Sequence, residues 1–302
     1  MKRRGRALDA VLLLDKPPGL SSNAAMQVAR RRFDAAKAGH GGTLDPLASG
    51  LLPLLFGEAT KFSQGLLDAG KAYLATVRLG ARTDTGDAEG RTLIERPVDV
   101  SDGRLAAALA RFRGDIVQVP PMHSALKRDG QPLYRLARRG LEVERAPRRV
   151  RIDRLELVRR EGRDLEIEVA CSKGTYIRTL ADDLGEALGC GAHLAALRRT
   201  AVGDFRVADA WTLERLEALP AAELPGALLP PDALVAGLAA VRLDSRRAER
   251  FGHGQALPEA GDGAPPGLRR VYAEDGRFLG VGEREPGGGL RPVRLLAASA
   301  SG

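Results

Sequence analysis

The stretch GHGGTLDPLASG, residues 39–50, is the place from which this chain is best understood. Its four glycines and one proline predict an irregular loop, because neither residue type suits the interior of a helix or strand. One acid, Asp45, stands there between Leu44 and Pro46. Apolar surroundings favour the neutral form of a carboxyl group unless a cation lies nearby. Asp45 is therefore either a nucleophile or base kept ionised by an arginine, or a loop residue that caps its own turn.

A cation for Asp45 is available in SKGTYIRTL, residues 172–180. A glycine here marks a junction between a strand and a helix, and such junctions direct side chains toward a shared site. Arg178 is the natural partner of Asp45 on this interpretation. The alternative is a surface pair between Arg178 and Asp182, four residues further on, which is worth only about a few tenths of a kcal/mol.

Regular elements are predicted on both sides of the Asp45 loop. Residues 10–15 are typical of a buried strand, and a residue at 21–23 can cap a helix that runs to about Phe33. Residues 71–80 alternate as a strand with Tyr73 on its core-facing side. The Tyr73 ring could stack on a base and its hydroxyl could exchange a proton, or the residue is plain core packing.

Further patterns predict helices, a hairpin and a second domain. Helices are expected after Ser101, over 132–140 and over 175–189, and a hairpin is expected around Gly162. From Val241, short strand-like pieces at 269–273, 278–283 and 291–296 alternate with Gly and Pro turns. We expect a large domain over 1–240, whose irregular order of elements indicates an α+β fold, and a small β domain over 241–302.

The charge balance points toward a polyanion. The chain has 47 basic and 39 acidic residues, a net charge of +8 over 302 residues. The segment from Arg138 to Arg163 holds ten arginines against five acids, and Arg198 and Arg199 add a pair. These side chains could contact phosphates, or the segment is a solvated amphipathic hairpin.

Several functions have no motif to support them. Walker A, GxGxxG, GxSxG and HExxH patterns are missing, and Cys171 and Cys190 form neither a CxxC pair nor a zinc pattern with the four histidines. The apolar run after MKRRGR is too short for a signal segment, and no stretch reaches the roughly 20 apolar residues of a membrane span. We expect a cytoplasmic protein.

Five blocks in chain order carry a resemblance: LDKPPGLSSN (14–23), GHGGTLDPLASGLLP (39–53), KAYLATVRLGARTDTGDAEG (71–90), PPMHSALKRDGQPLYRLARRG (120–140) and CSKGTYIRTLADDLGEALGCGAHLAALRRTAVGDF (171–205). Together they resemble the TruB family, bacterial tRNA pseudouridine synthases that act on uridine 55 of the T loop. The resemblance implies a pseudouridine synthase fold over 1–240, with a mixed, mainly antiparallel sheet flanked by helices. It implies a PUA-like RNA-binding domain over 241–302.

The resemblance also implies roles for single residues. It implies a catalytic aspartate at Asp45, an active-site tyrosine at Tyr73, and an arginine, Arg178, paired with the aspartate. Positions that contact the substrate are, by the same resemblance, His40, Tyr176 and Leu197, with Lys61 and Asp87 as secondary assignments. The chain departs from the family pattern at Gly41, where Thr is common, and at His123, where Tyr is common.

The implied reaction is an isomerisation in which the N1–C1′ bond of a uridine breaks, the uracil turns, and C5 bonds to C1′. The enzyme has to flip the base out of its stack, at about a few kcal/mol, and to keep the cut base from water. We therefore expect an apolar pocket of Leu44, Pro46, Leu47 and Leu197 around Asp45. No cofactor is expected, because no redox step occurs. The expected partner is tRNA, bound through the T arm and a distal part such as the acceptor stem, by a monomeric enzyme.

Alternatives remain for both the step and the function. Asp45 could attack C1′, attack C6 of the base, or act with Tyr73 on the C2′ proton in a glycal route. The scaffold could also serve a non-catalytic RNA-binding or RNA-folding protein, in which Asp45 could be replaced without loss of function. A synthase acting on another RNA is the remaining possibility.

Overall fold

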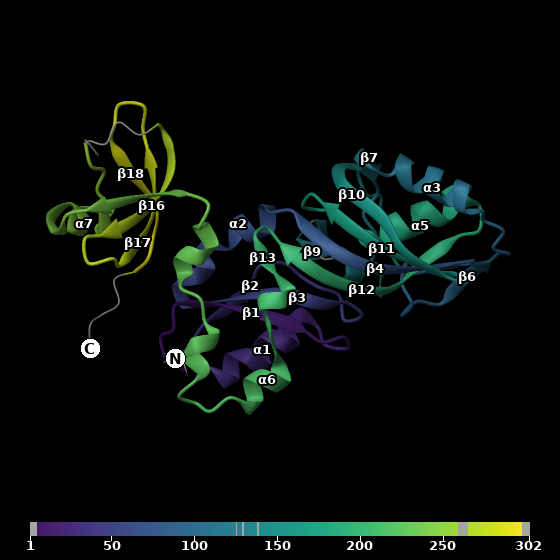
Figure 1. Cartoon of the computed structure of the whole chain (residues 1–302), viewed down its shortest axis with the longest axis horizontal. Coiled ribbons are helices and arrows are strands. Elements are labelled where there is room, and N and C mark those ends of the chain that lie inside the picture. Colours follow the sequence, from purple (N-terminus) through teal and green to yellow (C-terminus); the bar gives the residue numbers. More distant parts are fainter. Residues whose placement is uncertain (1–4, 125, 129, 138, 259–264, 298–302) are drawn as a thin grey trace.

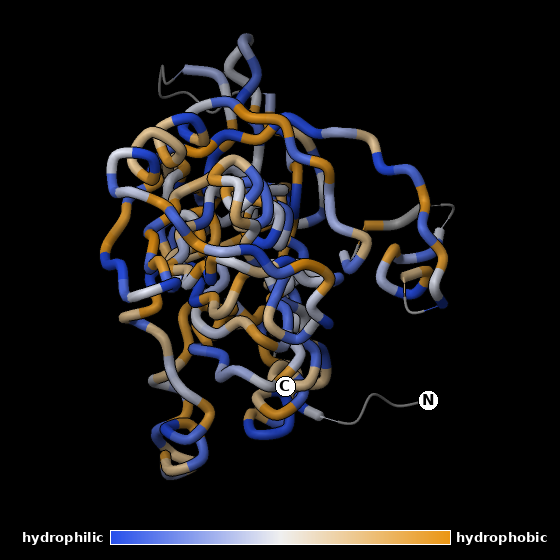
Figure 2. Tube along the Cα trace, turned by 90° about the vertical axis from the view of Figure 1, so that its right-hand side faces the viewer, coloured by the Kyte–Doolittle hydropathy of each residue, from blue (hydrophilic) through white to orange (hydrophobic). Residues whose placement is uncertain are grey.

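The computed structural model describes residues 5–124, 126–128, 130–137, 139–258 and 265–297. Within these ranges the chain forms a large mixed sheet flanked by helices, and a separate small sheet in its C-terminal part (Figure 1). The expected α+β class is confirmed. No helix in the described ranges is long and apolar enough to cross a membrane, and Figure 2 shows apolar and polar stretches alternating along the chain.

The large sheet has ten strands. In spatial order its main path is β14 (Trp211–Thr212), β1 (Ala10–Lys16), β3 (Ser49–Phe56), β12 (Ala192–Val202), β4 (Lys71–Leu79), β11 (Asp164–Cys171), β10 (Arg148–Glu161) and β7 (Gly114–Gln118), with β2 (Ala38–His40) on β3 and β13 (Phe205–Arg206) on β12. The pairs β1–β14 and β3–β12 are parallel and the others antiparallel. Strand β12 therefore lies between the strand that follows the Asp45 loop and the strand that carries Tyr73.

Strand β1 is buried on both faces. Leu12 and Leu14 belong to a core shared with α1 (Ser22–Arg32) and α6 (Leu213–Ala218), whereas Val11 and Leu13 belong to a core shared with α2 (Ser63–Asp68). A strand covered on both faces needs a continuous apolar run rather than an alternating one. This explains the sequence of residues 10–15, whose prediction as a buried strand is confirmed.

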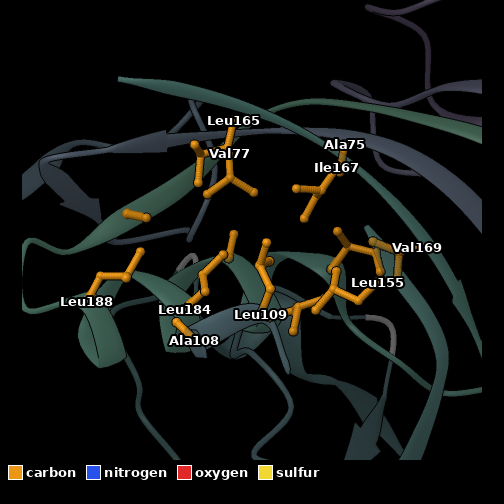
Figure 3. Close-up of a cluster of buried hydrophobic side chains, with 14 of the residues drawn as sticks. Ala75, Val77, Ala108, Leu109, Leu155, Leu165, Ile167, Val169, Leu184 and Leu188 are labelled. Atoms are coloured by element: carbon orange, nitrogen blue, oxygen red, sulfur yellow. The ribbon is translucent and has the colours of Figure 1, made fainter. Parts of the chain in front are cut away.

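The other half of the sheet is covered by α3 (Asp102–Arg111) and α5 (Ile177–Leu188). Val77 and Ile167, from β4 and β11, point toward Leu109 and Leu184 of these helices (Figure 3). Burying one such side chain stabilises the fold by about 1.5–3 kcal/mol. Tyr73 packs against the same core, so its predicted orientation on the core-facing side is confirmed.

The predicted helix ends and hairpin are also found. The Ser21 and Ser101 hydroxyls accept hydrogen bonds from backbone N–H groups in the first turns of α1 and α3, at 3.1 and 3.3 Å. Helix α5 ends at Gly189, whose φ of 82° lies in the left-handed region that glycine adopts without a steric penalty. Strands β10 and β11 turn at Gly162.

Short elements complete the large unit. They are the helix α4 (Leu133–Ala137), the 3-10 helices η1 (Gly57–Phe62), η2 (Val207–Asp209), η3 (Leu224–Ala227) and η4 (Pro231–Val235), and the two-stranded pairs β5 (Ala81–Thr83) with β6 (Thr92–Glu95) and β8 (Lys127–Arg128) with β9 (Gln131–Pro132). The helix predicted over 132–140 corresponds to α4.

The small sheet consists of β15 (Ala239–Leu243), β16 (Gly267–Ala273), β17 (Phe278–Arg284) and β18 (Leu290–Leu295), in that order, and packs with α7 (Ser245–Gly252). The three predicted strand pieces after residue 268 are confirmed, whereas α7 was not expected. Phe278 stacks against Phe62 of η1 at 5.8 Å between ring centroids, and the Tyr272 hydroxyl donates to Asp232 at 2.7 Å. The two units thus meet through specific side chains.

Candidate active site

The Asp45 loop connects β2 to β3 and is held in place by its neighbours. The Ser22 hydroxyl of α1 accepts from the Leu44 N–H at 2.7 Å and donates to the Leu44 carbonyl at 2.9 Å. The Ala48 N–H donates to the Asp45 carbonyl at 3.1 Å, which closes a turn. The loop therefore presents the Asp45 side chain from a fixed backbone.

Arg178 and Asp45 form an ion pair. The Arg178 Nη2 atom lies 3.0 Å from Asp45 Oδ2, and the arginine side chain is only 7% exposed. The alternative pairing with Asp182 is wrong, because Asp182 instead receives two hydrogen bonds from Arg82, at 2.6 and 2.8 Å. The spacing of four residues was therefore no guide to the partner of Arg178.

Arg178 is fixed by a second carboxylate and by two backbone carbonyls. Its Nη1 lies 3.5 Å from Asp87 Oδ2, and the Asp87 side chain is only 5% exposed. It also donates to the carbonyls of Thr85 and His123, at 3.1 and 2.6 Å. Asp87 thus reaches the site as a partner of Arg178. His123 contributes its backbone, so its departure from the family pattern leaves this contact in place.

A cavity of about 190 Å³ opens beside the ion pair. It is lined by Thr43, Leu44, Asp45, Tyr73, Ser124, Thr175, Tyr176, Ile177, Arg178 and Leu197. Pockets for whole ligands usually measure about 300–1,000 Å³, so this one suits a single ring rather than a complete nucleotide. Five of the eight residues named from the sequence line this cavity, and Asp87 is a sixth that joins them through Arg178.

The expected apolar wall is partly wrong. Leu44 and Leu197 line the cavity, but Pro46 is exposed and Leu47 packs into the core beneath the sheet. The Asp45 side chain is 44% exposed. Because the cavity is open at the carboxylate, the expected closed surroundings of Asp45 are not a property of this chain alone.

The two tyrosines at the cavity differ in their anchoring. Burial raises the pKa of Tyr73, and the positive charge of Arg199 acts in the opposite direction. Burial also raises the pKa of Tyr176. Gln118 holds the Tyr176 backbone by accepting from its N–H at 3.1 Å and donating to its carbonyl at 3.2 Å. Both rings are therefore neutral, positioned groups at neutral pH.

Arg198 and Arg199 are not a pair of phosphate ligands. Arg199 is 2% exposed and donates to backbone carbonyls of the Asp45 loop and β3. Arg198 lies on the opposite face and makes two hydrogen bonds to Asp15, at 2.9 and 2.6 Å. Adjacent residues on a strand point to opposite faces, and this gives the two arginines separate tasks.

The arginine-rich hairpin matches the solvated interpretation for most of its length. Arg151, Arg154 and Arg159 form ion pairs with acids on the same or a neighbouring strand. Arg148 and Arg149 make no ion pair among the described residues. Arg148 lies opposite Gln118 in the pairing of β10 with β7, and Gln118 holds the Tyr176 backbone, so Arg148 lies at the end of the hairpin nearest the cavity.

The structure does not bring His40 and Lys61 to the cavity wall. His40 lies on β2, where burial and the Arg199 charge lower its pKa, and its Nδ1 has no hydrogen-bond partner in the described ranges. Lys61 lies in η1, pairs with Glu58, and donates to the Leu295 carbonyl at 3.0 Å. Lys61 therefore connects the large unit to the C-terminal segment.

Three further residues belong to the site. They are Gln118, which holds the Tyr176 backbone, Arg199, which holds the Asp45 loop, and Lys16. Lys16 is fully buried, its ammonium donates to the carbonyls of Pro17 and Leu20, and burial lowers its pKa to about 8, an effect that the Asp45 charge opposes. A polar residue within an apolar strand was the one available signal for Lys16. No cluster of potential metal ligands occurs in the described part of the chain.

The arrangement can hold one planar ring between tyrosines and leucines, beside a carboxylate that an arginine keeps in place. Three family models match consecutive parts of the chain. The TruB family pseudouridylate synthase (N terminal domain) matches residues 30–177, the tRNA pseudouridylate synthase B C-terminal domain matches 178–236, and Pseudouridine synthase II TruB, C-terminal, matches 239–296. The fold, the site and these matches define the chain as a pseudouridine synthase.

Similar proteins extend over nearly the whole chain. The tRNA pseudouridine synthase B of Aromatoleum aromaticum is 58% identical over 300 residues, which are 99% of this chain and 96% of that protein. The one of Azoarcus sp. is 59% identical over 292 residues, 97% of this chain and 96% of that protein. The crystal structure of the archaeal box H/ACA sRNP Nop10-Cbf5 complex matches with a TM-score of 0.71 and 26% identity, over 97% of this chain and 88% of that one. The chain belongs to the TruB family.

Proposed function

We propose that this enzyme converts uridine 55 in the T loop of tRNA to pseudouridine, with Asp45 as the catalytic carboxylate. The observation that carries the proposal is the Asp45–Arg178 ion pair, 3.0 Å long, at the wall of a cavity sized for one ring. The relatives at 58–59% identity bear the name tRNA pseudouridine synthase B, which supports tRNA as the substrate.

The geometry suits an anionic oxygen that acts on a bound nucleotide. Arg178 contacts Oδ2 of Asp45, and no hydrogen bond from the described residues reaches Oδ1. A guanidinium beside a carboxylate stabilises its charged form. Oδ1 is thus the oxygen that faces a substrate, while Arg178 holds the other one.

Proton transfer is also required, because C5 of the base loses a proton and N1 gains one in the overall isomerisation. Tyr73 and Tyr176 both share the cavity with Asp45, and Tyr73 is the one on β4, directly opposite β12. We assign the Tyr73 hydroxyl to this exchange. Leu197 and Tyr176 hold the ring and exclude water while the glycosidic bond is open.

The tRNA backbone is the second part of the proposed substrate. Arg148, at the end of the hairpin nearest the cavity, would contact a phosphate next to the flipped uridine, and the C-terminal domain would hold a distal part such as the acceptor stem. We propose a domain boundary near residue 240, close to where β15 begins at Ala239, and a monomeric enzyme that needs no cofactor. The cytoplasmic location stays a prediction.

A different RNA substrate is the alternative. The solved neighbours with TM-scores near 0.7 include a structure titled as an H/ACA RNP bound to a substrate RNA, at 25% identity. The identity to the tRNA synthases is about twice as high and covers nearly the full length of both chains. This difference favours tRNA.

Incubation with an unmodified tRNA transcript, followed by mapping of pseudouridine, tests the proposal. We expect one pseudouridine, at position 55, and none in a matched transcript that carries cytidine there. Modification elsewhere in the same transcript, with position 55 untouched, would remove the tRNA T loop as the target.

A further inference from the structure

Arg199 is a large, almost fully buried side chain near the cavity, and the proposed reaction does not yet use it. It is 2% exposed and lies directly opposite Tyr73 in the pairing of β12 with β4. Its Nε donates to the Leu51 carbonyl at 2.7 Å, and its Nη atoms reach the carbonyls of Gly42 and Thr43 at 3.2 and 3.4 Å. Its positive charge also acts on the Tyr73 hydroxyl and lowers the pKa of that group.

A buried guanidinium without a carboxylate partner is expensive. Among the described residues, Arg199 forms no ion pair, and its hydrogen-bond acceptors are backbone carbonyls. An apolar residue of similar volume usually stabilises a core as well as or better than such a charge. A charge retained in this position beside a reacting cavity therefore points to a task in the reaction rather than in folding.

The contacts define that task. Arginine has donors only, so a guanidinium opposite Tyr73 attracts the phenol oxygen, and the phenol proton then points away from β12. The same guanidinium fixes Gly42 and Thr43, which come just before Asp45 in the loop. A single rigid guanidinium thus lies opposite Tyr73 and also holds the backbone that presents the carboxylate.

We propose that Arg199 is a positioning residue for the isomerisation, which aims the Tyr73 hydroxyl at the bound base and fixes its distance from Asp45. This inference rests on the proposed function. It goes further by stating how the proton-exchanging group is oriented and charged. Lysine has the positive charge of arginine but not its planar set of hydrogen-bond donors, and methionine has neither.

The charges that face Tyr73 come from three elements. They are Arg199 on β12, Cys171 on β11 and Asp45 on the loop. Arg199 lowers the pKa of Tyr73 against the effect of burial, whereas the other two raise it. Replacing Arg199 by methionine would therefore raise the Tyr73 pKa further. A proton exchange that involves the phenolate would then need a higher pH.

The test is a double-mutant cycle with Arg199→Met and Tyr73→Phe. Single-turnover rates are measured with saturating enzyme on the tRNA transcript, from about pH 6 to about pH 10. We expect Arg199→Met to lose at least ~100-fold at neutral pH, with part of the loss recovered as the pH rises. In the double variant we expect no further loss beyond about threefold relative to Tyr73→Phe alone.

Arg199→Lys and a neighbouring arginine keep the test informative if the methionine variant folds poorly. Arg199→Lys should keep the pH profile of the wild type while its rate falls about tenfold, because the fork is lost. Arg198→Met, on the same strand but paired with Asp15, should stay within about threefold of the wild type.

Multiplying losses in the double variant would show a purely structural role, and a wild-type rate for Arg199→Lys would equally overturn the inference. An inactive wild-type enzyme on every transcript would instead refute the proposed function.

Discussion

Replacing Arg178 by lysine removes a bridge between two carboxylates. The guanidinium contacts Asp45 at 3.0 Å and Asp87 at 3.5 Å, and it donates to two backbone carbonyls as well. The contact with Asp45 is through one nitrogen, so the two carboxylates share the fork. An ammonium has three donors on one atom and cannot reach all four acceptors that the two Nη atoms of the guanidinium contact.

The expected magnitude follows from these contacts. A hydrogen bond to a charged group is worth about 1.5–3 kcal/mol, and each ~1.4 kcal/mol changes a rate tenfold. If lysine stays with the more deeply buried Asp87, the contact with Asp45 is lost and the saturated rate should fall by about 10- to 150-fold. Arg178→Met should in addition destabilise the fold by about 3–5 kcal/mol, because Asp87 would be a buried charge without its cation.

Single-turnover measurements at saturating enzyme separate this effect from tRNA binding. Arg82→Lys is a suitable control, because Arg82 makes two short hydrogen bonds to one carboxylate, Asp182, outside the cavity. We expect the control to stay within about threefold of the wild type. A wild-type rate for Arg178→Lys, or equal losses in both variants, would refute the idea that this bridge positions Asp45.

Three further outcomes are expected. A chain ending at Val235 should bind tRNA about 30- to 1,000-fold more weakly, and its affinity should depend less steeply on salt, because it lacks exposed arginines such as Arg242 and Arg246, each worth ~1 kcal/mol per phosphate contact. Its reaction rate at saturating enzyme should change little, and an unchanged tRNA affinity would contradict this prediction. Lys61→Met should lower the melting temperature by about 1–3 °C and leave the saturated rate within about threefold, whereas a large loss of rate would return Lys61 to the substrate. Burial, with Asp182 nearby, raises the pKa of Asp183 to about 6, so the folded state binds the extra proton and wild-type stability falls as the pH rises from about 4 to 6. The stability advantage of Asp183→Asn should therefore grow over this range and be complete above about pH 6, and a difference in stability that does not change with pH would contradict this.

Local chemistry determined much of the fold in advance. Two helices begin with a side-chain hydrogen bond, from Ser21 and Ser101, and one ends at the positive φ angle of Gly189. These local interactions depend little on distant residues. The alternation of β4 likewise placed Tyr73 on the core face. Helix α7 escaped prediction because its eight residues hold few apolar positions, of which Ala248 and Phe251 are buried.

Site residues that belong to a sequence motif were predictable. Those whose place depends on how distant segments pair in the fold were not. Asp45, Arg178 and Leu197 follow from the family resemblance, and they do meet at one cavity. The role of Arg199 was not predictable from the sequence, because its burial opposite Tyr73 depends on the register of β12 against β4. Lys61 was assigned to the substrate, but its place depends on the C-terminal segment that returns to η1 at Leu295, which no local pattern encodes.

The central claim is that Asp45, held by Arg178, performs the isomerisation in this cavity. Asp45→Asn keeps the size of the side chain and removes its charge, so it tests the carboxylate itself. At saturating enzyme on an unmodified tRNA transcript, we expect tRNA binding within about threefold of the wild type. We expect pseudouridine formation to fall by at least ~10⁴-fold. Pseudouridine at position 55 formed at a near wild-type rate by Asp45→Asn would contradict the account.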